Sequence, residues 1–340
     1  MTQVQAGWST RSYREGDMPG IVDVYNAGFV ADGADIAYGE ADILAIISRP
    51  DFDLQRQVVI VDGPAVEGAP DCVVLGFGAV RLRDNKADNS RSYFLELAVH
   101  PSTVDRELHR AIASRLVAIA REMERDPGRQ AVERVRLKTV FSPKSEWLKA
   151  LFEELGLKEV RRFYLMTCPL DALEEPQAIE GVRIRGYRRP GDEDASRAAY
   201  NASFIDHFDF EPATREEWAY RINLSHQLPD LSWVAEIDSE PGRLAGFCMC
   251  AVFEEENEKM QRNWGWIDLL GTVRGWRHKG LGRSLLLHGL HSLKSAGYDT
   301  GALGVDTDSP TGATRLYESV GFSTHSLWLN YEAQLDEVKV

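Results

Sequence analysis

The residues whose types and spacing could do chemistry lie in one stretch, Arg277-His278-Lys279-Gly280-Leu281-Gly282-Arg283. An apolar run over residues 266–272 precedes it and a second apolar run over 284–290 follows it. This order predicts a strand, a tight loop and a helix. Glycines let a backbone approach a ligand closely, and N–H groups at a helix start attract anions. The stretch predicts a pyrophosphate-binding loop, with an ordinary helix start as the alternative.

Two other nucleotide-binding loops do not fit this chain. The sequence contains no G-x-x-x-x-G-K-[ST], which nucleotide triphosphatases need to cradle their phosphates. The stretch also lacks the third glycine of a dinucleotide fingerprint, and no acidic residue follows at the right distance. Both classes are therefore set aside.

The composition indicates an acidic protein with room for about two domains. The chain has 340 residues, of which 44% are hydrophobic, and its formal net charge is −14. That charge argues against a nucleic-acid partner, which needs a basic face, and suits an amine substrate. Four cysteines form no C-x-x-C and stand beside no histidine cluster, so no metal is expected.

The compartment is predicted from the same features. Unpaired cysteines indicate a reducing environment. The first residues are polar, without the apolar core of a signal peptide, and no run is long enough to span a bilayer. We expect a soluble cytoplasmic protein without a membrane partner.

The second half of the sequence repeats short segments of the first half, and a polar, acidic stretch that contains Pro176 separates the two halves. Residues 11–14 are echoed by 185–188, 25–29 by 200–204, 75–77 by 245–247, and 151–157 by 316–322. The echoes keep their order and spacing, which predicts two copies of one domain. Each copy reads as an α/β (α+β) unit, a mixed, mostly antiparallel sheet flanked by helices. We place the first domain at residues 1–172, a linker at 173–181 and the second domain at 182–340.

With these elements placed, the second copy resembles the Gcn5-related N-acetyltransferase (GNAT) superfamily. The family's main signature, [RQ]-x-x-G-x-[GA] between a strand and a helix, is met by Arg277, Gly280 and Gly282. Its second signature, approximately N-x-x-[AG]-A-x-x-L-Y-E-x-x-G-F, is met by residues 309–322, except that Ser309 replaces the usual Asn. Two such domains in one chain resemble mycothiol synthase and related tandem acetyltransferases.

The resemblance implies an N-acetyltransferase that uses acetyl-CoA as cosubstrate and acetylates the primary amine of a small molecule by direct attack. The strand before the loop would pair with the pantetheine arm where the sheet splays. Ser309 could replace Asn as a cap of the following helix. The implied coenzyme A site consists of Leu270, Gly271, Thr272, Arg277, His278, Lys279, Gly280, Leu281, Gly282, Arg283, Ser309 and Ala313.

The first copy has lost these features. Its loop positions, residues 104–109, contain no glycine and two acids, Asp105 and Glu107, which would repel a pyrophosphate. Phe152 stands where the second copy has a tyrosine. We therefore expect a degenerate first domain that is structural or shapes the substrate site, and a second domain that is the enzyme.

The resemblance implies a specific residue as the proton donor, whereas the residue that would act as the base has to be chosen among neighbours of the family's position. Tyr317 matches the family's general acid, whose phenol can give a proton to the departing thiolate. By our alignment the glutamate base of mycothiol synthases falls on Trp266. Asp268, two residues on and so on the same strand face, is our substitute, and Glu236 on the neighbouring strand is the second choice.

A long connection over residues 205–229 is predicted to cover the acceptor site, with Asp206, His207 and Asp209 as candidate substrate contacts. A loop packed by its own aromatic side chains is the alternative. The sequence leaves the acceptor open between a small molecule, of which mycothiol synthesis offers one, and a protein or peptide amine. A non-catalytic acyl-CoA sensor or partner-binding module is the competing class, and either a monomer or a homodimer fits.

Overall fold

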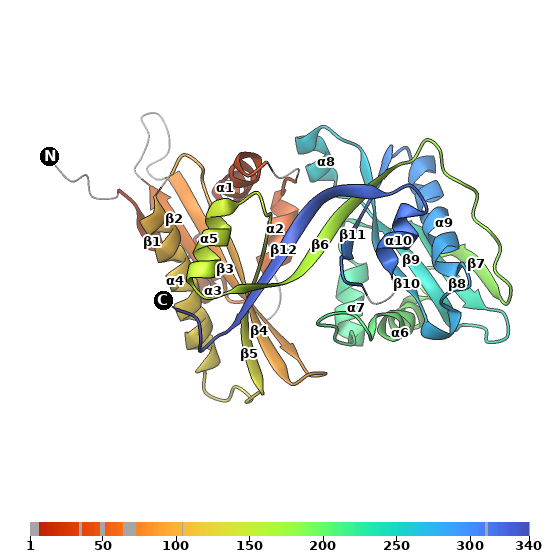
Figure 1. Ribbon diagram of the computed structural model, residues 1–340, viewed down its shortest axis with the longest axis horizontal. Coiled ribbons are helices and arrows are strands. Elements are labelled where there is room, and N and C mark those ends of the chain that lie inside the picture. The colour runs from red at the N-terminus through yellow and green to blue at the C-terminus, as the bar shows by residue number, and fades with distance from the viewer. Residues whose placement is uncertain are drawn as a thin grey trace. The chain divides into compact units, whose positions relative to one another are not determined.

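The computed structural model describes residues 7–33, 36–47, 52–63, 73–103, 105–309 and 312–339 (Figure 1). Val104, one of the loop positions of the first copy, and residues 310 and 311 of the second signature lie outside these ranges. The chain divides into two compact units. Unit 1 is Met1–Arg161 with Trp328–Val340, and unit 2 is Arg162–Leu327.

Unit 1 is a mixed sheet with helices on both faces. Its strands follow the order β1-β2-β3-β4-β5-β12, in which β4 and β5 are parallel and the other pairs whose registers are defined are antiparallel. The elements are β1 (Ser9–Arg11), α1 (Met18–Ala31), α2 (Glu40–Ile47), α3 (Leu54–Gln57), β2 (Val58–Gly63), β3 (Val73–Asn85), β4 (Ser90–Val99), α4 (Arg106–Glu124), β5 (Arg134–Phe141), α5 (Glu146–Glu154) and β12 (Ser323–Gln334).

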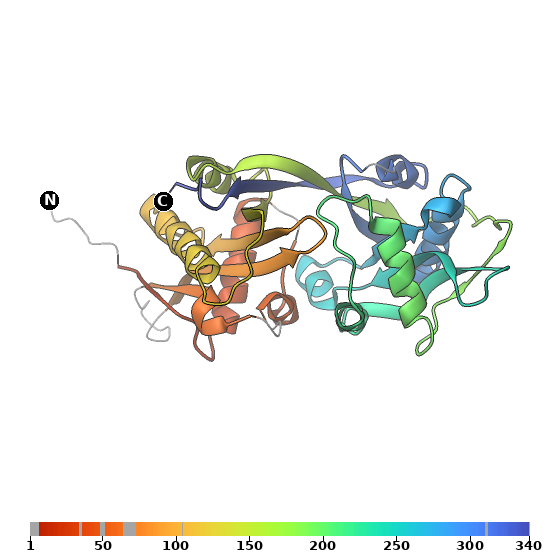
Figure 2. The ribbon, with the colours of Figure 1, turned by 90° about the horizontal axis from the view of Figure 1, so that it is seen from below.

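Neighbouring residues of β3 contact different helices, and these contacts show which helix covers each face of the sheet. Phe77 packs into the cluster formed by α1 and α2. Gly76 and Gly78 point the other way, where a Cβ would come within 2.9 Å of Ile112 on α4. Since successive residues of a strand face opposite sides, α1 and α4 lie on opposite faces, as Figure 2 also shows.

Unit 2 repeats this arrangement, with the strand order β7-β8-β9-β10-β11-β6 and a parallel pair at β10 and β11. The repeat and the mixed, mostly antiparallel fold predicted from the sequence are thereby confirmed. The elements are β6 (Lys158–Pro169), β7 (Val182–Gly186), α6 (Glu193–Phe204), α7 (Arg215–Ile222), β8 (Gln227–Ile237), β9 (Leu244–Ala251), α8 (Glu254–Met260), β10 (Trp264–Thr272), a 3₁₀ turn at Arg274–Trp276, α9 (Leu281–Ser295), β11 (Thr300–Asp306) and α10 (Ala313–Glu318).

The glycine–phenylalanine pair of β9 repeats the role of its counterpart in β3. Gly246 faces α9, where a Cβ would come within 2.9 Å of Leu285. Phe247 faces the opposite side and packs against Phe204 and Trp218 of α6 and α7. The apolar residues of α9 recur at helical spacing, and the helix is followed by Gly297 in the left-handed region.

The sixth strand of each unit comes from the segment that the sequence repeat assigns to the other copy. Residues 163–169 of β6 pair with β11 in unit 2, and residues 329–334 of β12 pair with β5 in unit 1. The compact units therefore do not coincide with a division at the linker. Strands pair with residues that can be far away in the sequence. The alternating pattern of a strand shows which residues share a face, but it does not show which other strand is the neighbour.

The segment proposed as a linker, residues 173–181, lies along α9. Ser284 Oγ donates to the Gln177 carbonyl at 2.6 Å, and a ring nitrogen of His291 lies 3.0 Å from the Glu174 carbonyl. Within the described residues, none of the helices combines the length and the apolar character that a bilayer crossing requires.

Candidate active site

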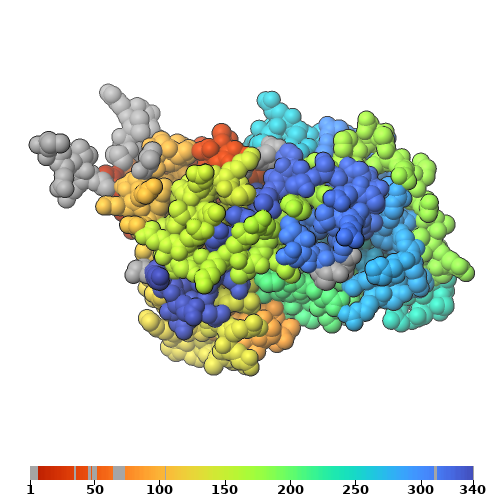
Figure 3. All heavy atoms as spheres, in the orientation of Figure 1, coloured from red at the N-terminus to blue at the C-terminus, as the bar shows by residue number. Residues whose placement is uncertain are grey.

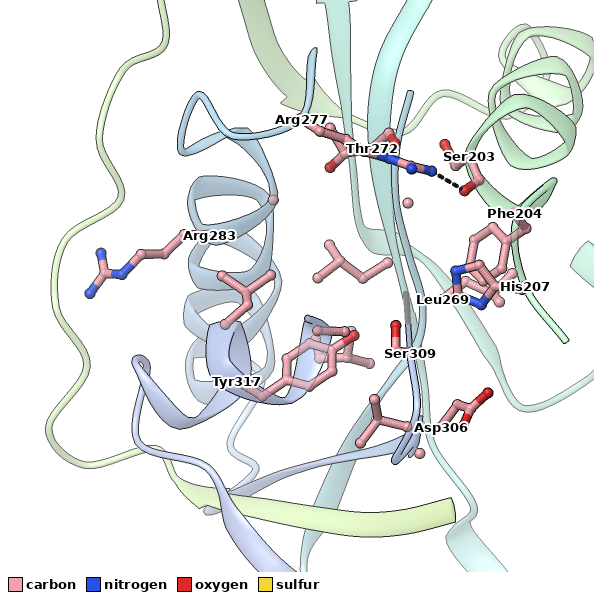
Figure 4. A pocket seen from close by; sticks show the side chains of 18 of the residues that line it. Ser203, Phe204, His207, Leu269, Thr272, Arg277, Arg283, Asp306, Ser309 and Tyr317 are labelled. Atoms are coloured by element: carbon pink, nitrogen blue, oxygen red, sulfur yellow. Dashed lines mark hydrogen bonds between the residues drawn. The ribbon is translucent and has the colours of Figure 1, made fainter. Parts of the chain in front are cut away.

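Unit 2 contains a cavity of about 440 Å³ where β10 and β11 separate (Figure 4). The two strands are paired only at residues 264–266 of β10, opposite 300–302 of β11. Beyond Trp266, β11 continues along β6 and β10 continues along β9. The facing edge of β10 is thus left open, and α6, α9, α10 and the glycine loop close the space around it.

The cavity brings together most of the residues that the sequence singled out. Its lining includes Leu270, Gly271, Thr272, Arg277, His278, Gly280, Leu281, Gly282, Arg283, Ser309, Ala313, Asp268, His207 and Tyr317. Lys279, Glu236, Asp206 and Asp209 do not line it.

The glycine loop presents an uncapped helix start to the cavity. His278 and Gly280 both have positive φ, 61° and 81°, so the chain turns sharply just before α9. The first turn of α9 has neither a side-chain cap nor an acidic residue. A Cβ on Gly282 would come within 3.3 Å of Thr272 Oγ1, so a side chain would fill the space beside the loop. These backbone N–H groups are free to bind an anion.

The three cationic side chains of the loop do not converge on the cavity. Arg277 donates to the carbonyls of Thr272 (3.2 Å) and Ser203 (2.7 Å), so it ties β10 to the end of α6. Arg283 is bonded to Glu174 and is directed away from the cavity in Figure 4. Lys279 lies over the Trp276 ring, 4.6 Å from its centroid. An anion bound at this loop would therefore be held mainly by the backbone N–H groups.

Gly271 of β10 lies where a side chain would collide with β9 and α6. A Cβ on Gly271 would lie 2.5 Å from the Phe247 ring and 3.1 Å from Ser203. The glycine keeps the strand narrow between β9 and α6. The backbone groups of β10 that face its open edge can pair with an extended ligand as an added strand would.

Tyr317 lies on α10 with only 8% of its surface exposed, and it lines the cavity. Burial, with a smaller contribution from Cys248, raises the pKa of its phenol well above the ordinary value. Its hydroxyl makes no hydrogen bond to another residue that the structure describes, and Figure 4 shows it directed into the cavity. The group therefore stays protonated and is free to donate.

Asp268 reaches the cavity because of a β-bulge. The register of β10 against β9 shifts between Ile267 and Leu269, which leaves Asp268 as the extra residue. Its carboxylate accepts hydrogen bonds from Gln227 (3.0 Å) and Arg221 (3.3 Å). Asp268 is thus an anchored anion at the cavity wall.

Glu236, the second choice for a base, lies outside the cavity lining. It accepts hydrogen bonds from Arg185 (2.8 Å), Arg183 (3.0 Å) and the Gly242 N–H (2.9 Å). These donors lower the pKa of its carboxyl to about 2, so it is a poor proton acceptor at neutral pH. Glu236 therefore belongs to an ion-pair cluster outside the candidate active site.

The connection after α6 supplies one residue of the predicted acceptor side. His207 lines the cavity, and its ring packs on Phe204 with the centroids 4.4 Å apart. Asp206 is instead bonded to Arg274 (2.5 Å) and Arg277 (3.1 Å), which lowers the pKa of its carboxyl. The same connection contains α7, whose capping box between Thr214 and Glu217 is readable in the sequence.

Asp306 and Phe163 are among the cavity residues that were not predicted from the sequence. Asp306 is the last residue of β11, and Phe163 belongs to β6. An acid at the end of a strand beside a turn was a readable signal for Asp306. No sequence signal indicated Phe163, because its position depends on which sheet β6 joins.

The expected cap at Ser309 is wrong. Gly312, with φ 67°, occupies the N-cap position of α10, three residues after Ser309. Ser309 lines the cavity instead. Among the described residues, no group of three or more His, Cys, Asp and Glu side chains could hold a metal ion.

The sheet that opens beside a glycine loop, together with the cavity between its strands, defines the class of the protein as an acyltransferase. The model of the acetyltransferase (GNAT) family matches residues 195–322. A mycothiol acetyltransferase from Streptomyces griseus subsp. griseus is 30% identical over 243 residues, which cover 70% of this chain and 71% of that protein. The chain belongs to the GNAT family of N-acyltransferases, as the motifs predicted.

Solved structures agree with the tandem fold. A Gcn5-related N-acetyltransferase from Sphaerobacter thermophilus superimposes with a TM-score of 0.74 at 24% identity, covering 98% of this chain and 97% of that one. A tandem GNAT protein from the clavulanic acid biosynthesis pathway gives 0.65 at 14% identity, covering 96% and 98%. At these identities the likeness concerns the fold alone.

Proposed function

We propose that this protein transfers the acetyl group of acetyl-CoA to the primary amine of a small-molecule acceptor. The observation that carries the proposal is one cavity with an uncapped helix start on one wall, an open strand edge along it and the Tyr317 hydroxyl directed into it. A pyrophosphate, an extended pantetheine arm and a departing thiolate require these three features in turn.

Each part of the cosubstrate then has a protein partner. The N–H groups of residues 280–283 bind the pyrophosphate, since a helix start favours negative charge. The backbone of Leu270–Thr272 pairs with the amides of the pantetheine arm. Gly282 leaves the space beside the loop free of a side chain. Ser309 and Ala313 line the wall near the start of α10.

The chemical step needs one proton removed and one supplied. The neutral amine attacks the thioester carbonyl, a C–N bond forms, and the C–S bond breaks as the thiolate leaves. Tyr317 gives its phenolic proton to that sulfur. Asp268 attracts the acceptor's ammonium group, since its carboxylate lies at the cavity wall.

A small-molecule acceptor is supported by the relatives, which are named mycothiol acetyltransferases. A cavity of about 440 Å³ with carboxylates at Asp268 and Asp306 also fits a compact cation. The acidic overall charge, −14, favours the approach of an amine.

A thiol-release assay tests the proposal. The protein is incubated with acetyl-CoA and a panel of amino sugars, amino acids, polyamines and N-terminal peptides, and free coenzyme A is measured. Release that depends on a small amine supports the proposal. Binding of acetyl-CoA without release on any amine would favour an acyl-CoA sensor, and release on peptides alone would favour a protein acceptor. Propionyl-CoA and longer thioesters measure the acyl preference in the same assay.

A further inference from the structure

His207 occupies the wall of the cavity across from Tyr317. α6 ends at Phe204, and the chain turns so that the His207 N–H donates to the Phe204 carbonyl at 2.8 Å. The imidazole then packs on the Phe204 ring and lines the cavity. Figure 4 shows the two side chains on opposite sides of the space, His207 toward β10 and Tyr317 on α10.

The His207 ring nitrogens are available to a ligand, unlike the carboxylates of Asp268 and Asp306. They make no hydrogen bond to any residue that the structure describes. Asp268 is already bonded to Gln227 and Arg221, and Asp306 accepts from the Asp308 N–H at 3.0 Å. Both carboxylates thus already accept hydrogen bonds from the protein, whereas an unpartnered ring nitrogen can accept one from an acceptor amine.

The charges around His207 keep the imidazole neutral near pH 7. Burial lowers the pKa of the ring, and Arg277 lowers it further, while Asp306 and Asp206 act in the opposite direction. Asp268, His278, Arg283 and Tyr317 are the other titratable or charged side chains that line the same cavity. A neutral imidazole is the form that can accept a proton.

The glycine loop fixes the segment that carries His207. Asp206, the preceding residue, is bonded to Arg274 and Arg277 on the loop side, and Arg277 also holds the Ser203 carbonyl at the end of α6. The loop that we propose to bind the pyrophosphate therefore also positions the opposite wall. Asp206 is a positioning residue in this arrangement.

We infer that His207 is the general base of the transfer, an inference that rests on the proposed function. A ring nitrogen takes a proton from the acceptor's ammonium group, which leaves the nitrogen lone pair free to attack the thioester. The imidazolium then returns this proton to solvent. Tyr317 gives its phenolic proton to the coenzyme A thiolate, and the nitrogen loses its second proton once the C–N bond has formed. That second proton restores the Tyr317 phenol, so that one proton is released to solvent in each transfer. The Asp268 carboxylate at the cavity wall attracts the ammonium group.

The test compares His207→Gln with His226→Gln on an amine that the wild type acetylates. His226 is a matched control because it also packs on an aromatic ring, that of Phe253 at 4.7 Å, and does not line the cavity. We expect His207→Gln to lower kcat/KM for the amine about 10²-fold or more at pH 7, and to remove one acidic limb of the pH–rate profile. The Kd for acetyl-CoA should stay within about twofold, because a neutral side chain across the cavity does not hold the phosphates.

Two acceptors with different amine pKa values separate the base from the substrate. The limb of the pH–rate profile that reports His207 should lie at the same pH with both acceptors. The limb that reports the acceptor's amine should shift with the pKa of that amine. A His207→Ala variant should be partly rescued by added imidazole. An acidic limb that survives in His207→Gln, with kcat/KM within about threefold of wild type, would overturn the assignment. A wild type that releases no coenzyme A with any amine would instead remove the proposed reaction, and the role of His207 with it.

Discussion

Arg185 and Glu236 form an ion pair of 2.8 Å that unit 1 repeats with Arg11 and Asp62 at 2.5 Å. Each arginine also binds a second carboxylate seven or six residues further on, Asp192 in unit 2 and Asp17 in unit 1. The same contact occurs in the copy that has lost its glycine loop. The carboxylate of Glu236 thus serves the fold that the two copies share.

Replacing Glu236 by Gln should lower stability and leave the reaction unchanged. Loss of the charge leaves Arg185 incompletely paired, which typically costs about 1–3 kcal/mol. Because folding lowers the pKa of Glu236 from 4.5 to about 2, its stabilisation is present above pH 4.5 and is lost as the pH falls toward 2. Urea unfolding of both proteins at pH 7 and pH 3 should show a smaller difference at pH 3. A large fall in kcat in a folded variant would return Glu236 to the catalytic residues.

Tyr317→Phe should fold and bind acetyl-CoA but lose most of its turnover. The phenol is buried, raised in pKa and directed into the cavity, so phenylalanine keeps the packing and removes only the donor. General acids of this kind contribute about 10²–10⁴-fold to rate. Steady-state kinetics with Tyr220→Phe as the control, an exposed tyrosine on α7, measure the loss. Equal kcat values for the two variants would exclude Tyr317 as the acid.

Gly282→Val should weaken acetyl-CoA binding without unfolding the protein. The first Cβ already comes within 3.3 Å of Thr272 Oγ1 and 3.4 Å of Leu316, and the added methyls extend into the space beside the loop. We expect the Kd for acetyl-CoA to rise at least about tenfold, which corresponds to about 1.4 kcal/mol. Titration calorimetry measures it, with Gly275→Ala as the control, since no atom lies within 4 Å of a Cβ there. Unchanged affinity would place the phosphates elsewhere.

Asp268→Asn should raise KM for the amine and leave the Kd for acetyl-CoA unchanged. The variant keeps an acceptor oxygen for Arg221 and Gln227 but removes the charge that attracts an ammonium group. An increase of about tenfold is expected for loss of one partly buried charge contact. The acidic limb of the pH–rate profile should persist, because this aspartate is not the base. Its disappearance would reverse the roles of Asp268 and His207.

One molecule of acetyl-CoA should bind per chain. Around the start of α4 the first copy has Asp105 and Glu107, and Asp105 caps the helix by accepting from the Glu107 N–H at 2.8 Å. That helix start is therefore already satisfied by a carboxylate, which also repels a phosphate. Calorimetry on the full chain gives the stoichiometry. A second equivalent of similar affinity would mean that unit 1 has kept a site.

The loop, the repeat and the class of fold could be predicted because their signals are local in sequence. The glycine-containing stretch before an amphipathic run predicts a sharp turn and an open helix start. Both are present, with the turn at His278 and Gly280 and the uncapped start at Leu281. The echoed segments predict a second copy, since similar short sequences form similar elements. Tyr317 follows from its motif, and its helix turns it into the cavity.

The remaining features depend on residues far apart in the chain. Simple alternation correctly put Asp268 on the face of Trp266, but only the register of β10 against β9 revealed the bulge, and only α7 and β8 supplied its two partners. Glu236 resembled a free carboxylate until β7 brought Arg183 and Arg185 beside it. His207 lies in a connection without a helical or strand-like pattern of apolar residues. The position of its side chain could therefore not be predicted from the sequence.

The sequence by itself determined that the chain carries two copies of an acyltransferase fold and that only the second keeps the glycines and the tyrosine. The tertiary structure alone decided which sheet each sixth strand joins, which carboxylates are bound by arginines, and which histidine faces the tyrosine across the cavity. The reason is physical. Turns and helices are set by neighbouring residues, whereas strand partners, ion pairs and cavity walls form between residues that meet only after the chain has folded.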